Sequence, residues 1–451
     1  MNLFRRILQR PTLELDDIQA TALRARPEPY FGTHAILEIL DEVAGKELLR
    51  RLAPRVTSAA RWDEPRPSWL ALAISYHGLA ALGVPDASLA SFPANFRAGM
   101  AARAHRLRDV GVNAPAKWEA PFGSPRVHIA LSVYAADERD WRREVAAYQN
   151  QLRTLPGVRL LSHQDFGVTA PARNVFGYRD GFTQPVVEGS GAGSLPGDGR
   201  PIKAGEFVLG YPSETGQPLT MPAPDVLGRN GTYVVFRKYH SHVAAFNRFL
   251  RDNASTDEQR ELLAAKLVGR WRSGAPLALS PERDDPALGE DPRRFNDFDF
   301  TDDPRGLRTP LGSHIRRMNP RAAKLEVLSD VNIRRIIRRS TSYGRPLPTN
   351  QLVDDGKERG LDFIALGARA IDTVEFLQSE WVNSGNFAGL GKEKDPLISL
   401  QDKGAYFTVP GAPPRRVHGI QSFNTLRGGE YFFMPSLSAI EWLTSHQEGR
   451  Q

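Results

Sequence analysis

The sequence predicts an α+β fold made of two similar halves, and two observations lead to this prediction. Short runs rich in β-branched and aromatic residues alternate along the chain with segments of helical periodicity. The same strand and helix order occurs early in the chain and again after a polar connection over residues 188–231. Such alternation is typical of α+β proteins, in which helices cover one face of each sheet. At 451 residues, the chain is long enough for two such units.

The first half contains four predicted elements. Leucines recur near the helical period from Ile36 to Val56, which predicts a helix there. The run from Val127 to Ala135 predicts a strand, and Asp137 is a suitable N-cap for the helix that follows. Pro156 and Gly157 end that helix, and Val158 to Ser162 predicts the next strand.

The second half contains three predicted strands, and each is followed by a predicted helix. The three pairs are Thr232–Arg237 with Phe246–Leu250, Leu361–Leu366 with Ile371–Val382, and Glu430–Met434 with Ser436–Leu443. The connection over residues 188–231 is rich in Gly, Pro, Ser and Asp, so we expect it on the surface. A second polar stretch, residues 280–308, contains little to bury and is interpreted as either a functional cover or an unselective insertion. We therefore predict an N-terminal half over residues 1–190, a connection over 191–230 and a C-terminal half over 231–451.

The amino-acid composition limits which partners and which kinds of chemical site the protein can have. The net charge of +7 makes anionic partners electrostatically favourable, although the bias is mild for a chain of this length. The sequence has no cysteine, which excludes disulfides, thiolate nucleophiles, iron–sulfur clusters and zinc sites that need sulfur. Any metal must therefore be bound by histidine or oxygen. The residues before Pro11 lack the apolar stretch of a secretory signal, and no later run is long enough to span a membrane, so we predict a cytoplasmic protein.

The first candidate site lies in the string from Asn174 to Pro185, where Asp180 stands between Gly177 and Gly181. Glycine adopts positive φ and allows close approach of a ligand, so the carboxylate can be held rigidly beside a planar cofactor. A simple turn uses the same residue types for local reasons. This string alone leaves both interpretations open.

A second string, Gly312–Arg321, places His314 in an arginine-dense segment about two dozen residues ahead of Arg338 and Arg339. One interpretation is a basic surface on which the histidine has no special role. The other is a haem iron ligand with arginines near anionic groups.

Four strings occur in the order that is typical of one family. They are F-G-Y-R-D-G-F-T-Q-P, G-S-H-I-R-R-M-N-P-R, G-L-D-F-I-A-L with E-F-L-Q-S-E-W, and R-G-G-E-Y-F-F-M-P-S. Together they resemble the dye-decolorising peroxidase family, particularly its larger forms. The resemblance implies duplicated ferredoxin-like halves, each an antiparallel sheet with helices packed on it, and a b-type haem between the sheet and the helices of the C-terminal half. It also implies a peroxidase that uses hydrogen peroxide to oxidise bulky dyes and phenolic or other aromatic reductants.

The resemblance assigns roles to individual residues. His314 matches the proximal haem ligand, and Asp395 matches the acceptor for its other ring nitrogen. Asp180 matches the distal acid, held by Gly177 and Gly181. Arg338 is the better match for the distal arginine, with Arg339 as its competitor, and Leu361 and Phe363 match the apolar residues that narrow the distal space.

Two other functions stay open from the sequence. One is a haem-handling protein that stores haem or releases iron without useful turnover. The other is a nucleic-acid binder that uses the arginine-rich region Ile315–Arg339, although we expect neither nucleic acid nor membrane as a partner. A homo-oligomer is left open. Trp381 and Tyr343 are candidates for surface radical sites, and His240 and His242 are interpreted as alternating residues of a strand.

Overall fold

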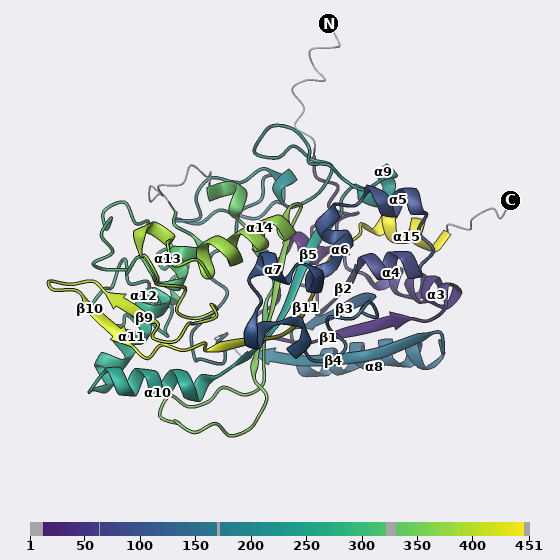
Figure 1. The fold of residues 1–451 in the computed structure, drawn as a ribbon. Coiled ribbons are helices and arrows are strands. Elements are labelled where there is room, and N and C mark those ends of the chain that lie inside the picture. Colours follow the sequence, from purple (N-terminus) through teal and green to yellow (C-terminus); the bar gives the residue numbers. More distant parts are fainter. Residues whose placement is uncertain (1–11, 63, 169–171, 322–330, 446–451) are drawn as a thin grey trace, which may run out of the picture.

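The computed structural model describes residues 12–62, 64–168, 172–321 and 331–445. Within these ranges, one nine-stranded sheet runs through the molecule in the order β4-β1-β3-β2-β11-β5-β8-β6, and β7 also pairs with β8. All the strand pairs in it are antiparallel. Figure 1 shows β1 to β4 on one side of the molecule, and α10 to α13 with the β9–β10 hairpin on the other.

The N-terminal half of the sheet has the ferredoxin-like arrangement. Its elements are β1 (Tyr30–Ile39), α3 (Glu42–Leu52), β2 (Ser68–Ile74), β3 (Ile129–Ala135), α8 (Glu138–Arg153) and β4 (Val158–Val168). The chain order is strand, helix, strand, strand, helix, strand, and the spatial order is fourth, first, third, second. This combination defines the ferredoxin-like unit.

The C-terminal half repeats the same spatial order. Its strands are β5 (Thr232–Ser241), β6 (Ile337–Arg338) with β7 (Thr341–Tyr343), β8 (Gly360–Gly367) and β11 (Asn424–Met434). They lie in the order β11-β5-β8-β6, which is again fourth, first, third, second. Helices α10 (Val243–Asn253) and α11 (Asp257–Val268) follow the first strand, and α14 (Ala370–Phe376) follows the third. The predicted duplication of ferredoxin-like halves is confirmed.

The remaining elements are short, and several of them surround the sheet. They are α2 (Ala20–Leu23), α4 (Tyr76–Ala81), α5 (Asp86–Ser91), α6 (Ala94–Ala102), α7 (Ala104–Leu107), α9 (Asp225–Gly228), α12 (Pro286–Glu290), α13 (His314–Met318), β9 (Tyr406–Val409), β10 (Arg415–His418) and α15 (Leu437–Ser445). A π-helical turn, Leu377–Val382, continues α14. The predicted helix from Ile371 to Val382 is therefore present as these two segments.

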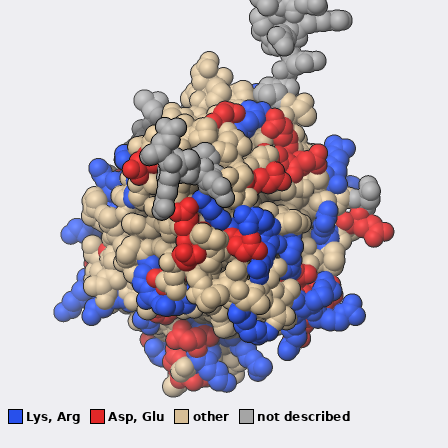
Figure 2. Space-filling model, turned by 90° about the vertical axis from the view of Figure 1, so that its right-hand side faces the viewer, with Lys and Arg blue, Asp and Glu red and all other residues tan. Residues whose placement is uncertain are grey.

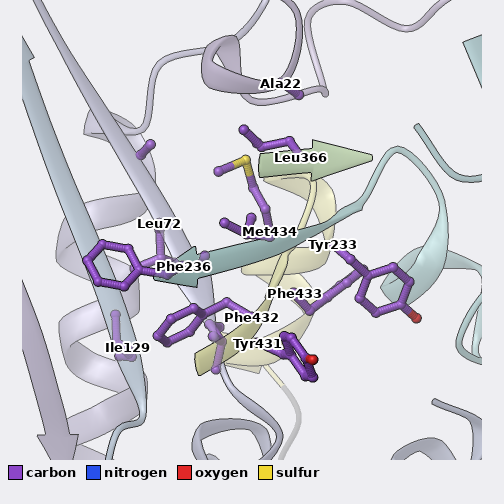
Figure 3. Close-up of a cluster of buried hydrophobic side chains, with 14 of the residues drawn as sticks. Ala22, Leu72, Ile129, Tyr233, Phe236, Leu366, Tyr431, Phe432, Phe433 and Met434 are labelled. Atoms are coloured by element: carbon purple, nitrogen blue, oxygen red, sulfur yellow. The ribbon is translucent and has the colours of Figure 1, made fainter. Parts of the chain in front are cut away.

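The two halves share one hydrophobic core. They meet where Phe433 of β11 pairs with Ile74 of β2. Figure 3 shows aromatic residues of β5 and β11 beside Leu72 and Ile129 from the N-terminal half, and all of these side chains are buried. The C-terminal helix α15 packs against α3. Burial of apolar surface across this junction stabilises both halves together.

One predicted helix is wrong in its first part. Residues Tyr30–Ile39 form strand β1, and the helix begins only at Glu42, where the side chain of Asp41 accepts a hydrogen bond from the N–H of Ala44 at 2.8 Å. Nearly every residue of β1 is buried on one face of the sheet or the other. A strand buried on both faces has a continuous apolar run without alternation, and such a run resembles a buried helix. The predicted N-cap of α8 is confirmed, because Asp137 accepts from the N–H of Asp140 at 2.8 Å.

The connection between the halves is not the surface segment that its composition predicts. Phe207, Val208, Leu209 and Tyr211 are buried in the shared core, as is Leu227 in α9. The second polar stretch also buries residues, among them Leu288, Asn296 and Phe300. Polar composition failed as a guide here because most of residues 202–213 are buried, and these include the polar residues Glu206 and Ser213. The division into residues 1–190, 191–230 and 231–451 remains a prediction.

The surface carries both signs of charge. Figure 2 shows Lys and Arg interspersed with Asp and Glu on the face that lies at the right of Figure 1. Among the helices of the described ranges, none combines the length and the apolar character needed to cross a membrane.

Candidate active site

The segment around Asp180 is a tightly bonded turn. The side-chain oxygen of Asn174 accepts from the N–H groups of Phe176 at 3.0 Å and Tyr178 at 3.2 Å. Gly177 and Gly181 have φ of 85° and 93°, as expected from their positions on either side of Asp180. The N–H of Asp180 donates to the carbonyl of Ala172 at 3.1 Å, and its carboxylate accepts from the N–H of Gly181 at 2.7 Å. The half-buried carboxylate is therefore held by backbone geometry that favours glycine on both sides.

Arg338 lies beside this turn. Its guanidinium donates to the carbonyls of Phe182 and Thr183, both at 2.9 Å, and its N–H donates to the side-chain oxygen of Gln184 at 3.0 Å. Burial lowers the pKa of Arg338 from its usual value, while the nearby carboxylate of Asp180 acts in the opposite direction. Arg338 thus faces the predicted acid, and the three residues after Gly181 hold it there.

Arg339 points to the other face of the sheet. Its Nε donates to the carbonyl of Thr21 at 3.0 Å, and its Nη1 donates to the carbonyl of Arg338 at 3.0 Å. Burial is the main cause that lowers its pKa to about 10. Successive residues of a strand face opposite sides, so only one of the two arginines can lie beside Asp180.

Leu361 and Phe363 share the face of Arg338. Arg338 pairs with Ala365 in the sheet, and residues that pair directly project to the same side. Leu361 and Phe363 precede Ala365 by four and two residues, so they project to that side as well. Both are half-buried, whereas Asp362 and Ile364 between and after them are buried. The two apolar residues and the arginine therefore form one wall.

His314 and Asp395 form a hydrogen-bonded pair on the helical side of the C-terminal half. His314 opens α13, and its Nδ1 lies 2.9 Å from Oδ2 of Asp395. Asp395 is fully buried, and its second oxygen accepts from the N–H groups of Leu397 at 2.9 Å and Ile398 at 3.0 Å. Burial raises the pKa of Asp395, but His314, Arg317 and the N–H of Ile398 outweigh it and hold the pKa below its usual value. An ionised acceptor fixes the proton on Nδ1 and leaves Nε2 with a lone pair.

Arg316 and Arg317 are structural, because both side chains are buried and hydrogen-bonded. Arg316 is buried and donates to Asp303 at 3.1 Å and to the carbonyl of Thr309 at 2.7 Å. Arg317 is buried and donates to the carbonyl of Trp381 at 2.8 Å and to the carbonyl of Glu393. Both arginines tie the short helix that carries His314 to its surroundings.

A cluster of four arginines lies next to the Asp180 segment, and it was not predicted from the sequence. Its members are Arg270, Arg321, Arg335 and Arg338. Burial is the largest cause that lowers the pKa of Arg270 to about 9 and those of Arg321 and Arg335 to about 10, and positive neighbours lower them further. Asp198 is the acid that acts on both Arg321 and Arg335. Arg321 ends the string that contains His314, but no local pattern in the sequence points to Arg270.

The residues of the site fit an anionic iron porphyrin. The Nε2 of His314 has no hydrogen-bond partner among the described residues, which suits a metal bond. The side chain of Arg335 forms no hydrogen bond or ion pair within the described ranges, although it is half-buried beside Arg321 and Arg338. A guanidinium that is withdrawn from solvent needs an acceptor, and the propionates of haem are anionic acceptors.

Comparison with known proteins identifies the family. The sequence model of Dyp-type peroxidase, C-terminal, matches residues 215–413. The chain is 32% identical to a dye-decolorizing peroxidase of Exidia glandulosa, over 95% of this chain and 87% of that protein. It is 31% identical to the dye-decolorizing peroxidase AauDyP1 of Auricularia auricula-judae, over 91% and 80% of the two chains. The chain belongs to the dye-decolorising peroxidase family and is a haem-dependent peroxidase.

Solved structures agree with this membership over the whole fold. An ancestral D-type dye-decolorizing peroxidase superposes with a TM-score of 0.83 and 28% identity, covering 97% of this chain and 100% of that chain. A dye-decolorizing peroxidase in complex with 2,6-dimethoxyphenol superposes with a TM-score of 0.81 and 28% identity, covering 96% and 100%.

Three other expectations are decided by burial and contacts. Trp381 and Tyr343 are both buried, so neither is a surface site as we expected. His240 lies in β5, but this strand ends at Ser241, so His242 is not the strand residue that we expected. The two histidines bond to Glu358 and Thr425, respectively, and no group of three metal-ligating side chains occurs in the described ranges. In the part of Ile315–Arg339 that the structure describes, three arginines are buried, which removes the exposed basic face that a nucleic-acid binder needs: Arg316, Arg317 and Arg339.

Proposed function

We propose that this peroxidase binds haem b through Nε2 of His314 and uses hydrogen peroxide to oxidise phenolic and other aromatic reductants, including bulky dyes. The observation that carries this proposal is the 2.9 Å hydrogen bond between His314 and the fully buried Asp395. It fixes the imidazole orientation and makes the free nitrogen a better ligand. In this proposal, the haem lies between the sheet and the helices of the C-terminal half.

Asp180 and Arg338 act on the peroxide. When bound, haem supplies the iron and porphyrin that give two electrons to peroxide and recover them from the reductant. The carboxylate of Asp180 takes a proton from one peroxide oxygen and returns it to the other, as a general acid–base catalyst does. The guanidinium of Arg338 stays charged and donates to the oxygen on which negative charge develops. Phe182 and Thr183 orient it through their carbonyls.

The arginine cluster holds the cofactor's propionates. Arg335 is the best placed of the four because its guanidinium is not engaged by another described residue. Arg321 already donates to the carbonyls of Gly197, Asn296 and Phe298 at 3.2, 3.0 and 2.6 Å, so its position is fixed. Leu361 and Phe363 limit the space on the peroxide side and exclude bulky reductants from it.

The substrate class is inferred from a relative. One solved dye-decolorizing peroxidase with this fold contains 2,6-dimethoxyphenol, which supports phenolic reductants for this chain. A cytoplasmic location and a homo-oligomeric state remain predictions.

Replacing His314 tests the proposal. The His314→Ala variant should bind hemin at least 100-fold more weakly than the unaltered protein, because the metal bond and its fixed orientation are both lost. Hemin titration followed at the Soret band measures this effect. The matched control is His242→Ala, which removes another half-buried histidine whose Nε2 lies 2.7 Å from the hydroxyl of Thr425. It should bind hemin normally.

Two outcomes would contradict the proposal in different ways. A His314→Ala variant that retains its Soret band and peroxide turnover would show that another residue is the ligand. Unaltered protein that binds hemin but bleaches no dye with peroxide would favour haem handling over catalysis.

A further inference from the structure

Asn296 lies where the two long polar segments meet the active site. It belongs to residues 280–308, and only 1% of its surface is exposed. Its side-chain oxygen accepts from the hydroxyl of Thr183 at 2.7 Å, from Nη2 of Arg270 at 3.4 Å and from Nη2 of Arg321. One amide oxygen thus contacts both the segment that holds Arg338 and two members of the arginine cluster.

The other end of the amide fixes its orientation. Its Nδ2 donates to Oδ1 of Asp198 at 3.1 Å, and the second oxygen of Asp198 accepts from the N–H of Leu195 at 2.8 Å. Guanidinium groups donate but do not accept, so the amide oxygen must face Arg270 and Arg321, and the amide nitrogen then faces Asp198. The backbone of Asn296 also approaches Gly197 so closely that a β-carbon there would lie 1.7 Å from the carbonyl oxygen. Residues 191–230 and 280–308 are therefore locked together at this point.

Thr183 connects Asn296 to Arg338, because it bonds to both residues. Thr183 has φ of 54°, which is rare for a residue with a branched side chain, and its carbonyl accepts from Arg338 at 2.9 Å. Its hydroxyl bond to Asn296 holds the residue in this conformation. A shift of Thr183 would move the acceptor of the guanidinium that faces Asp180.

The side chain of Asn296 is neutral, and this affects the net charge around the arginines. A neutral oxygen orients Arg270 and Arg321 without neutralising them, whereas a carboxylate would form ion pairs and cancel part of the positive charge. Asp198 already acts on both Arg321 and Arg335, Asp297 and Asp299 act on Arg321, and Asp180 acts on Arg338. A neutral amide at position 296 therefore adds no further negative charge that would compete with an anionic ligand.

We propose that Asn296 is a positioning residue that sets both the peroxide-side arginine, through Thr183, and the anion-binding arginines. This inference rests on the proposed function, in which Arg338 acts on peroxide and the cluster binds propionates. It also gives residues 280–308 a role in the site, which their composition left undecided.

Two substitutions separate the effect of Asn296 on Arg338 from its effect on the anion-binding arginines. Thr183→Val removes only the hydroxyl bond, so the rate of the first spectral change after mixing holoenzyme with peroxide should fall about three- to tenfold. Its hemin affinity should stay unchanged.

Asn296→Ala removes both sets of contacts, so the same rate should fall at least tenfold and hemin should bind about tenfold more weakly. Since Asn296→Ala already removes the acceptor of the Thr183 hydroxyl, the double variant should react with peroxide no more slowly than Asn296→Ala alone.

The matched control is Asn247→Ala. Asn247 is similarly buried in the same half, and its amide donates to the carbonyls of Pro348 at 3.0 Å and Gln351 at 2.9 Å, which take no part in the contacts of Asn296 with Thr183 and the arginines. This variant should lose thermal stability as Asn296→Ala does, but its hemin affinity and peroxide rate should match those of the unaltered protein.

The outcomes distinguish this inference from the proposed function. If the unaltered protein binds hemin and reacts with peroxide but Asn296→Ala matches it in both, only the role of Asn296 is overturned. Additive effects of the two substitutions would overturn the path through Thr183. If Asn296→Ala fails to fold, Thr183→Val alone tests this path, and a normal peroxide rate in Thr183→Val would overturn it. Unaltered protein that takes up no hemin would remove both proposals.

Discussion

The two faces of the strands β6 and β8 have opposite characters, although neighbouring residues in the chain supply them. The front face carries Arg338, Leu361 and Phe363, which are half-buried. The back face carries Arg339 and Asp362, which are buried among residues of both halves. Arg338 is held by loop carbonyls beside Asp180, whereas Arg339 reaches back to Thr21 near the start of the described chain.

The back face also contains an unusual acid. Neither carboxylate oxygen of Asp362 has a hydrogen-bond partner among the described residues. It lines a small cavity of about 50 Å³, whose other polar neighbours include Lys238, Glu119, His34 and His163. Lys238 is paired with Glu119 at 2.8 Å, so it is not free to neutralise Asp362 fully. Burial accordingly raises the pKa of Asp362 to about 7, although Lys238 opposes this shift.

This comparison shows that polarity alone does not mark the active site. Both faces contain an arginine, and the back face also contains Asp362, whose pKa is raised by burial. The front face differs because its side chains are half-buried and residues 172–184 bring Asp180 beside Arg338. Substitutions on each face should therefore affect different measurements.

The largest effect is expected on the front face, for Arg338→Leu. Loss of the guanidinium removes the donor to the developing negative charge, so the rate with peroxide should fall about 100- to 1000-fold. Stopped-flow measurement of holoenzyme at a fixed pH tests this. Arg339→Leu should instead leave that rate within about twofold and lower the free energy of unfolding by about 1–3 kcal/mol, because it leaves the carbonyl of Thr21 unpaired. Equal kinetic losses in both variants would refute the division between faces.

The next effect concerns stability on the back face, for Asp362→Asn. The folded pKa of about 7 lies above the usual 3.8, so the unfolded chain releases this proton first. Below about pH 4, neutral Asp362 makes its full contribution to the free energy of unfolding, and this contribution is lost as the pH rises from 4 to 7. Asp362→Asn removes this loss, and at pH 8 it should raise the free energy of unfolding by on the order of 3 kcal/mol. Denaturant titrations at pH 4 and pH 8 measure the difference, and an identical pH dependence in both proteins would contradict the prediction.

The smallest pair of effects concerns apolar neighbours in β8. Phe363→Ala widens the front wall, so the KM for a phenolic reductant should change about three- to tenfold with a modest loss of stability. Ile364→Val, one residue further on the buried face, should lower the free energy of unfolding by about 0.5–1.5 kcal/mol and leave KM unchanged. Steady-state kinetics and thermal unfolding of both variants provide the test. A change in KM for Ile364→Val would mean that the two faces are coupled.

Much of the fold and part of the site followed from the sequence. Strand and helix order in the second half, the N-cap at Asp137 and the positive φ of Gly177 and Gly181 are local properties, so short stretches of sequence determine them. The pairing of His314 with Asp395 was suggested by resemblance and is present as a hydrogen bond. The strand β1 was missed because burial on both faces removes the alternation that identifies a strand.

Local sequence is enough to place adjacent residues of β6 and β8 on opposite sides of the sheet, because a strand alternates with a period of two. Which of the two sides lies beside Asp180 depends on the tertiary fold. The pairing of Arg338 with Ala365 sets the common face, and the fold of residues 172–184 and 280–308 brings Asp180 and Asn296 near it, with Arg270 bonded to Asn296. Those contacts join residues 26 to 154 positions apart in the chain, and no local pattern encodes them.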